Sequence, residues 1–424
     1  MSSLRRTPRP FSPIAITGQA CVLPGAPDIA RFAQGVLRGF DAVTAAPPRR
    51  WGLDHARVLR PGMPPEPAGQ ETTTSDAGGY VTDFRWDTTG LHLPPPALDG
   101  LDPLVHWLIA TGRDALADAG VDVSDPCALT RTGAVFGNLS FPSEGMARWG
   151  ERVVLEGAGR RYTGPPVRPE NALMSGLPAD LLAAALALGE GAFALDAACA
   201  SALYATKLAC DTLSSGRADR MLAGAVNRAD NLFLHIGFSA LGAMSRSGRS
   251  RPFHRDADGL VPAEGCAFVV LERLEDALRD GRHILGVIRG IGLANDGRAR
   301  GLLAPSPEGQ ERAMRAAWAG AGLDARTVQI VECHATGTPT GDRTEVASLG
   351  ALLAGAREQL AGLLQVLGDR GRRDHLQRRD LHEARRGRVA ALAHCVVPEL
   401  VSCCAPRVPP TGSTRGSTQV PVTS

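Results

Sequence analysis

Residues 195–213 read LDAACASALYATKLACDTL. The preceding apolar run, 191–195, predicts a short strand, and the residues from Cys199 onward have helical spacing that ends at Gly216. Cys199 is therefore predicted at a strand–helix junction, between small residues that leave room for a substrate. A helix N-terminus supplies unpaired amides and stabilises anions, so we expect a lowered thiol pKa and a nucleophilic thiolate. The pattern alone also allows a small buried core cysteine.

A second candidate residue lies in the stretch ECHATGTPTGD, residues 332–342. His334 follows a strand predicted over 328–331 and precedes a loop rich in threonine and glycine. Loops at strand ends are where α/β proteins place chemistry, so His334 is a candidate catalytic residue. A lone histidine at such a position can equally be structural.

Along the rest of the chain, strand patterns alternate with helix patterns, which predicts a layered α/β protein. The segment 266–271 (CAFVVL) is apolar on both faces, as in a sheet that is covered on both sides. Strands are predicted over 14–17, 133–137, 191–195, 221–226, 266–271, 284–291 and 328–331, and helices over 104–119, 275–280, 309–321 and 344–354. Residues 41–100, rich in Pro, Gly and Thr, are predicted to form a long surface excursion.

Composition excludes several classes of protein. With 44% hydrophobic residues the 424-residue chain can build a large core, and a net charge of +2 argues against nucleic acid as a partner. No apolar run reaches the ~18 residues of a membrane span, and no His/Cys cluster has zinc-site spacing. The nine cysteines are scattered without a CxxC pair, which favours a reducing cytoplasm. Motifs for a P-loop, a dinucleotide site, a zinc protease and a serine hydrolase are absent.

Five stretches carry a resemblance to a known family: GNLSFP (137–142), residues 195–230, GLVPAEGCAFVVLERLEDALRDG (259–281), GIGLANDG (290–297) and ECHATGTPTGD (332–342). Residues 12–355 resemble the β-ketoacyl synthases, in particular the ketosynthase domains of polyunsaturated-fatty-acid synthases and similar iterative type I polyketide synthases. The resemblance implies a thiolase-like layered αβαβα fold of two similar halves, and a homodimer.

The resemblance also implies a reaction. An acyl group moves from the phosphopantetheine arm of an acyl carrier protein onto Cys199, and a malonyl thioester then loses CO2 and attacks the acyl group. His334 matches the histidine that assists decarboxylation, and Thr336 and Thr338 match threonines expected to contact the pantetheine arm. Both threonines could instead stabilise the loop. No bound cofactor is expected, since phosphopantetheine arrives on the carrier protein. Asp342 and Glu345 match acidic positions, and we expect them to organise the site.

The chain departs from the family pattern after residue 355. The family carries there a KSxxGH stretch, with a catalytic lysine and the second catalytic histidine, and a glycine-rich FGxGG-type stretch. Neither is present, and no lysine follows Lys207. His375, His382 and His394 lie in roughly this region, but none follows Lys-Ser or a glycine. We therefore divide the chain into a disordered leader (1–12), an N-terminal ketosynthase half (13–275), the start of a C-terminal half (276–360) and an aberrant Arg/Cys-rich tail (361–424). On this division the second half of the fold is incomplete, and a frameshift near residues 355–362 is our hypothesis for the break.

Two alternative functions stay open on the sequence. The missing lysine and second histidine favour a catalytically impaired remnant or a non-condensing partner subunit, which would form a stable acyl-enzyme without product. A Cys–His hydrolase is the other alternative, and it would release free acid without malonyl substrate.

Overall fold

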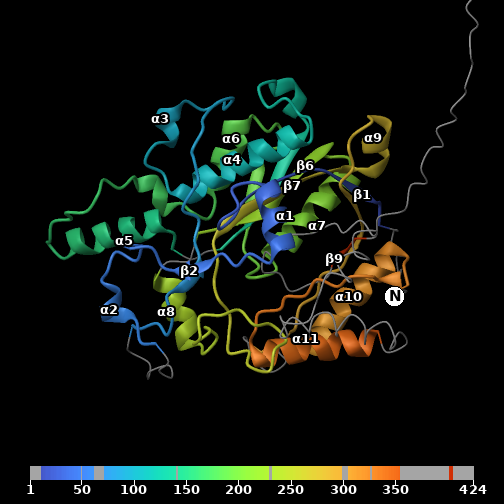
Figure 1. The fold of residues 1–424 in the computed structure, drawn as a ribbon. Helices are drawn as coiled ribbons and strands as arrows, with labels where there is room; N and C mark the ends of the chain where they lie inside the picture. Colours follow the sequence, from blue (N-terminus) through green and yellow to red (C-terminus); the bar gives the residue numbers. More distant parts are fainter. Residues whose placement is uncertain are drawn as a thin grey trace, which may run out of the picture.

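The computed structural model describes residues 11–48, 50–61, 71–139, 142–228, 232–297, 304–324, 327–353 and, as backbone, 401–403. These residues form a mixed α/β structure around a central sheet (Figure 1). Its seven strands run in the order β5-β4-β6-β7-β1-β8-β9. They are β1 (Ile14–Val22), β4 (Thr132–Asn138), β5 (Ala192–Leu195), β6 (Arg220–Asn227), β7 (Gly265–Arg273), β8 (Gly286–Ile291) and β9 (Val401–Cys403).

Eleven α-helices lie in the described residues, and two of them have only four residues. They are α1 (Ile29–Arg38), α2 (His55–Val58), α3 (Pro95–Leu98), α4 (Pro103–Asp118), α5 (Glu144–Gly157), α6 (Leu177–Leu186), α7 (Ser201–Ser214), α8 (Leu232–Ala240), α9 (Leu274–Arg279), α10 (Pro307–Ala321) and α11 (Pro339–Leu352), with single 3-10 turns at Pro126–Leu129 and Pro169–Ala172. None of the helices in the described ranges is long and apolar enough to cross a membrane.

The central sheet is covered on both faces, as predicted. β4 runs parallel to β5 and β6, whereas β7 is antiparallel to β6 and to β1. Side chains of alternating parity along the strands enter two separate cores. Helices α4 and α6 pack on one face, and α7 packs on the other.

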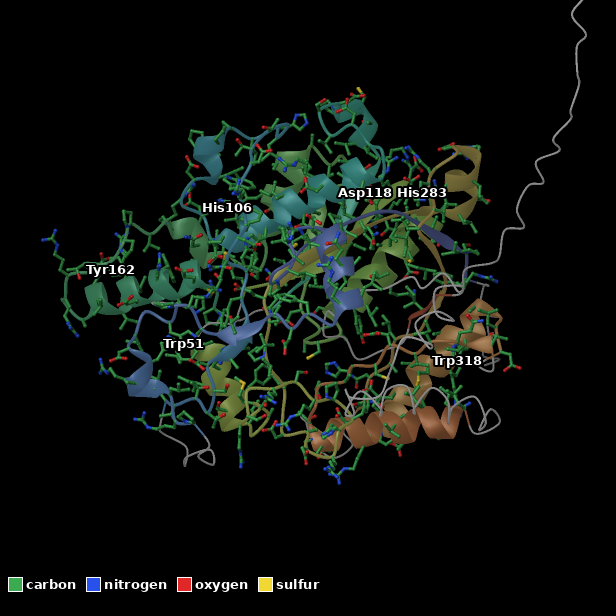
Figure 2. All side chains as sticks on the ribbon, viewed as in Figure 1. Trp51, His106, Asp118, Tyr162, His283 and Trp318 are labelled. Carbon is green, nitrogen blue, oxygen red and sulfur yellow. The ribbon has the colours of Figure 1, made fainter. Side chains whose placement is uncertain are left out.

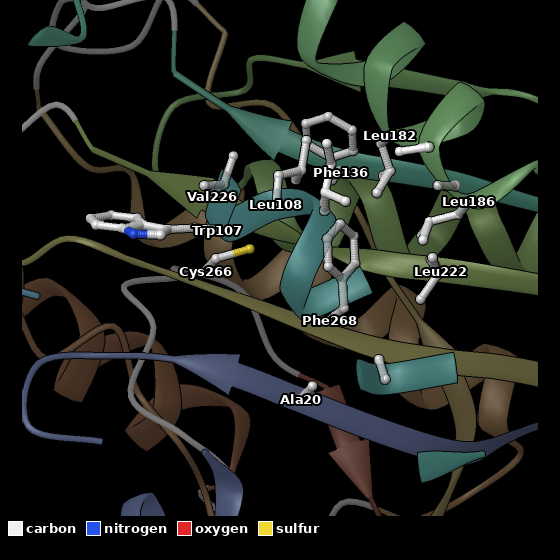
Figure 3. Close-up of a cluster of buried hydrophobic side chains, with 14 of the residues drawn as sticks. Ala20, Trp107, Leu108, Phe136, Leu182, Leu186, Leu222, Val226, Cys266 and Phe268 are labelled. Carbon is white, nitrogen blue, oxygen red and sulfur yellow. The ribbon is translucent and has the colours of Figure 1, made fainter. Parts of the chain in front are cut away.

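Figure 3 shows the first of these cores, between the sheet and helices α4 and α6. Phe136 of β4 and Phe268 of β7 meet edge to face, with their ring centroids 5.9 Å apart. Leu108 of α4 and Leu186 of α6 are fully buried against them. Each such side chain contributes about 1.5–3 kcal/mol through burial, so this core fixes the strands that lead to the site.

Two glycines let helices approach the sheet closely at equivalent places in the two halves. A Cβ on Gly18 of β1 would lie 2.5 Å from the carbonyl oxygen of Ala115 on α4. A Cβ on Gly290 of β8 would lie 2.3 Å from the carbonyl oxygen of Ala317 on α10. Only glycine fits where a helix backbone comes this near to a strand.

The same two helices end alike. Gly120 after α4 and Gly322 after α10 both adopt positive φ, 70° and 61°, which glycine does without strain. Each belongs to a similar tetrapeptide, AGVD at 119–122 and AGLD at 321–324. This short repeat, not identified from the sequence alone, relates the two halves of the fold.

Three predicted elements differ in the structure. The first strand continues through Gly18 to Val22, with a register shift between Ile16 and Gly18. Gly18 does not end the strand, and its lack of a Cβ lets α4 pack closely against β1. The strand predicted over 328–331 is not formed, since no strand in the described residues pairs with it. The helix predicted to begin at 344 begins at Pro339, where proline suits the first helical position.

The excursion over residues 41–100 is only partly irregular. β2 (Val43–Ala45) and β3 (Ala77–Gly79) pair as a small second sheet. Trp51, labelled in Figure 2, packs with Val58 of α2 and with Leu232 at the start of α8. The excursion therefore has a small core of its own.

Candidate active site

Cys199 lies at the junction between β5 and α7, which confirms the position predicted from the sequence. The chain turns sharply just before it, because Ala198 has φ 52°, a left-handed conformation that costs a residue with a Cβ about 1 kcal/mol or more. Asp196 stabilises the turn by accepting a hydrogen bond from the Ala198 N–H at 2.9 Å. The turn leaves the Cys199 side chain exposed.

Ser201, near the start of α7, stabilises the sharp turn at Ala198 through two hydrogen bonds. Its hydroxyl donates to the Ala198 carbonyl at 2.7 Å and accepts from the Ala197 N–H at 2.8 Å. The side chain is buried against Gly137 of β4, where an added Cβ would lie 2.6 Å from the Ser201 Cβ. The sequence showed both residues within matching stretches but gave no role for either.

The prediction of a lowered thiol pKa is wrong. Partial burial raises the pKa of Cys199, and the Asp196 carboxylate raises it further, while the residue's own backbone N–H lowers it. Water still reaches the exposed sulfur, which tempers the effect of burial. At neutral pH the thiol is therefore mostly protonated, and acyl transfer to it requires removal of a proton.

We expect Ser201→Ala to loosen the turn that presents Cys199. The Ala197 N–H loses a buried acceptor, which costs about 1–3 kcal/mol of unfolding free energy. Denaturant titration measures this loss, and the rate of iodoacetamide alkylation at Cys199 should change with it. Thr212→Ala, on the exposed face of α7, is the control. An unchanged alkylation rate in Ser201→Ala would contradict the role of the hydroxyl.

His334 lies in an extended segment whose backbone is held by a half-buried carboxylate. Glu345 of α11 accepts hydrogen bonds from the His334 N–H at 2.6 Å and from the Ala335 N–H at 3.0 Å. Ala335 has φ 51°, so the chain also turns sharply beside this candidate residue. Asp342 accepts from the Gly337 N–H at 3.1 Å, which holds the other end of the loop. These contacts confirm that Asp342 and Glu345 organise the loop.

The His334 imidazole is neutral at physiological pH. Burial lowers its pKa to about 4, and within the described structure its buried Nδ1 has no hydrogen-bond partner. Burial also raises the pKa of Glu345 and of Asp342, although backbone N–H groups oppose this. A neutral ring with a free polar atom can exchange a hydrogen bond with a bound substrate.

We expect NMR titration of the histidine side chains to give a midpoint of about 4 for His334, well below an ordinary histidine. In the unfolded chain this histidine takes up a proton at about pH 6.5. The free energy of unfolding is therefore highest above pH 6.5 and falls progressively as the pH drops toward 4, because protonation then favours the unfolded chain. The spectrum of His334→Gln assigns the signal. A midpoint near 6.5 would contradict the burial of the ring.

Thr336 and Thr338 are brought together by the loop. Their hydroxyls lie 2.8 Å apart, and the Thr336 hydroxyl accepts from the Thr338 N–H at 3.3 Å. These bonds support the loop-stabilising alternative, and the pantetheine contact stays a prediction.

The described hydrogen bonds and ion pairs do not join Cys199 directly to His334. His375, His382 and His394 lie outside the described residues.

A segment that sequence reasoning did not connect to the site lies against the His334 loop. The Phe253 N–H donates to Asp342 at 2.6 Å, and the Gly259 N–H donates to the Gly337 carbonyl at 3.0 Å. Local spacing could not reveal these contacts, since about 80–90 residues separate the partners.

In the described part of the chain, no group of His, Cys, Asp and Glu side chains could hold a metal ion.

Two family models match consecutive parts of this chain. The N-terminal domain model of β-ketoacyl synthase matches residues 11–277, and the C-terminal domain model matches residues 285–366. The chain belongs to the β-ketoacyl synthase family. The N-terminal match contains Cys199, and the C-terminal match contains His334, so each half of the synthase contributes one candidate residue.

Two relatives of the synthase are much longer than this chain. It is 33% identical over 369 residues to the PKS-NRPS hybrid synthetase ATPKS of Aspergillus niger, covering 86% of this chain and 19% of the relative. It is 36% identical over 342 residues to the phthioceranic/hydroxyphthioceranic acid synthase of Mycobacterium tuberculosis, covering 80% of this chain and 15% of the relative. The synthase thus spans less than a fifth of these relatives.

Solved structures confirm the thiolase-like ketosynthase fold. The keto synthase–chain length factor PfaC aligns with a TM-score of 0.73 and 36% identity, covering 81% of this chain and 38% of that one. The oxazolomycin ketosynthase domain OzmH KS7 of Streptomyces albus aligns with a TM-score of 0.68 and 28% identity, covering 81% and 58%. The C-terminal family match ends at residue 366, and the domain bounds proposed from the sequence stay predictions.

Proposed function

We propose that this synthase is a β-ketoacyl-[acyl carrier protein] synthase, an acyltransferase that catalyses decarboxylative Claisen condensation with a malonyl thioester. The observation that carries the proposal is the position of Cys199, exposed on a sharp turn at the start of α7. Membership of the β-ketoacyl synthase family supports it. We place the reaction in cytoplasmic fatty acid or polyketide biosynthesis.

The first half-reaction is acyl transfer. The Cys199 sulfur attacks the thioester carbonyl of an acyl carrier protein, the carbon–sulfur bond to phosphopantetheine breaks, and the pantetheine thiol leaves with the proton that Cys199 gives up. Amides in the first turn of α7 are suited to stabilise the oxyanion of the tetrahedral intermediate. The raised pKa of Cys199 makes proton removal part of this step.

The second half-reaction is condensation. The malonyl carrier loses CO2, and the electron pair of the broken carbon–carbon bond forms an enolate. The neutral His334 ring donates a hydrogen bond to the enolate oxygen, which lowers the barrier to decarboxylation. The enolate carbon then attacks the acyl carbonyl, the bond to the Cys199 sulfur breaks, and the β-ketoacyl product remains on the carrier.

Carrier recognition follows from the loop at 334–338. We propose that Thr336 and Thr338, whose hydroxyls are partly buried beside His334, contact the pantetheine arm. Phosphopantetheine is then a substrate group that the carrier delivers, and no resident cofactor is proposed.

We also propose that the synthase is a homodimer that pairs through β5. This strand ends the sheet, and within the described ranges no strand pairs with its outer edge. Phe193 at its centre is 44% exposed. An open edge with an exposed aromatic side chain is a template for pairing with a second copy. We expect Phe193→Glu to shift the sedimenting species from dimer to monomer, whereas a wild-type monomer would contradict this arrangement.

Intact mass spectrometry tests the proposed reaction. The purified chain is incubated with an acyl carrier protein thioester and then with malonyl carrier protein. The expected result is acylation of Cys199 followed by a β-ketoacyl carrier and regeneration of the free thiol. A stable acyl-enzyme with no condensed product, or free acid formed without malonyl carrier, would overturn the proposal.

A further inference from the structure

Residues 245–258 form a compact loop that is organised around one carboxylate. Asp258 accepts hydrogen bonds from the Ser245 hydroxyl at 2.8 Å, from the Ser247 N–H at 2.8 Å and from the Ser247 hydroxyl at 3.1 Å. Ser245 is fully buried, and it also accepts from the Arg249 N–H at 3.1 Å. One carboxylate therefore fixes the start of the loop against its end.

The charge on this carboxylate is stable at neutral pH. Burial works to raise the pKa of Asp258, but the hydrogen bonds from Ser245 and Ser247 and the nearby Arg251 outweigh it and lower the pKa. Arg251 in turn donates to the Ser247 hydroxyl at 2.8 Å. An ionised acceptor with three donors makes stronger hydrogen bonds than a neutral one.

The loop meets residues 334–342, the His334 segment, at two points. Gly259, the residue after Asp258, donates its N–H to the Gly337 carbonyl at 3.0 Å. At the loop's tip, Phe253 has φ 57° and donates its N–H to Asp342. A Cβ on Gly337 would lie 2.9 Å from the Gly259 carbonyl oxygen, so the two backbones are in tight contact.

We propose that Asp258 is a positioning residue for His334, acting through the Gly259–Gly337 and Phe253–Asp342 hydrogen bonds. The inference rests on the proposed role of His334, but its geometry does not depend on turnover. Asp258 holds the loop in the shape that presents both N–H groups to the His334 segment. Without that shape the two donors separate, and the stretch from His334 to Asp342 loses two of the hydrogen bonds that hold its backbone and the Asp342 carboxylate.

The test uses Asp258→Asn in the full chain and measures side-chain access. Diethyl pyrocarbonate modifies neutral imidazoles, and its rate at each histidine is followed by peptide mass spectrometry at pH 7. Asparagine keeps the size but offers one acceptor oxygen without charge, so we expect modification of His334 to rise about tenfold. Iodoacetamide alkylation of Cys199 should stay within about twofold of wild type, because the turn that carries Cys199 is held by Asp196 and Ser201 and not by the 245–258 loop.

Two internal controls separate positioning from general loosening. Asp256 is an exposed acid in the same loop, and it pairs with His254 and Arg255. Asp256→Asn should leave the modification rate of His334 unchanged. The buried His235, which bonds Ser75 and Tyr80, reports on the fold as a whole. Ser245→Ala should reproduce the Asp258→Asn result at His334.

The outcomes decide the proposal without reference to activity. A selective rise at His334 in both Asp258→Asn and Ser245→Ala supports it. An unchanged His334 rate, or equal increases at His334, His235 and Cys199, would overturn it. Failure of the condensation assay alone would instead count against the proposed function and leave the positioning result intact.

Discussion

Replacing Cys199 with alanine is expected to abolish the acyl-enzyme and to lower the rate of acyl transfer by roughly 10⁴-fold or more, as removal of a nucleophile does. The thiol is the exposed group at the strand–helix turn, and alanine removes it without adding bulk. The fold should be unaffected, because the Ser201 hydrogen bonds that hold the turn involve backbone atoms of other residues.

The measurement is the mass shift of the intact chain after incubation with an acyl carrier protein thioester. Cys127→Ala is the matched control, since this cysteine is also exposed but follows Pro126 in a turn far from α7 in sequence. It should acylate like wild type. Acylation of Cys199→Ala that maps to another cysteine would show that Cys199 is not the nucleophile.

The second large effect is expected for Glu345→Ala. The change leaves the His334 and Ala335 N–H groups without their acceptor in a half-buried segment. A shift of the ring by about 1 Å costs on the order of 10² in rate, so condensation should fall by roughly that factor. Acyl transfer to Cys199 should change little, because Glu345 holds the other half of the fold.

The two half-reactions are measured separately, as acyl-enzyme formation and as release of CO2 from malonyl carrier protein. Glu311→Ala on α10 is the control, because this acid pairs with Arg315 four residues further along the same helix. An equal loss in both half-reactions would contradict a specific effect on His334. So would a CO2 release rate equal to that of wild type.

The sequence was sufficient for the position of Cys199 but not for its acidity. A strand that runs into a helix is a local pattern, and the structure confirms it. The thiol pKa depends on how much protein surrounds the sulfur and on the direction of the Asp196 carboxylate. Neither is encoded in spacing, so the expected lowering of the pKa was wrong.

The His334 loop shows the same limit at longer range. Its order and its acidic residues could be predicted from the match over 332–342. The strand expected at 328–331 requires a neighbouring strand, and an apolar run does not reveal whether one is available. The contact between Gly259 and Gly337 joins segments that are distant in sequence, so only the folded chain identifies Asp258 as a residue to test.

The place of β1 in the sheet has a consequence for synthesis on the ribosome. Ile14 pairs with Arg273 on one side and with Ile288 on the other. At 5–20 residues per second, the first of these partners is translated roughly 13–50 s after β1. During that interval an apolar strand emerges with both edges open, which is the state that most invites aggregation or chaperone binding. Slow translation between residues 22 and 273 would prolong this exposure, so codon usage over that stretch should affect the yield of folded synthase.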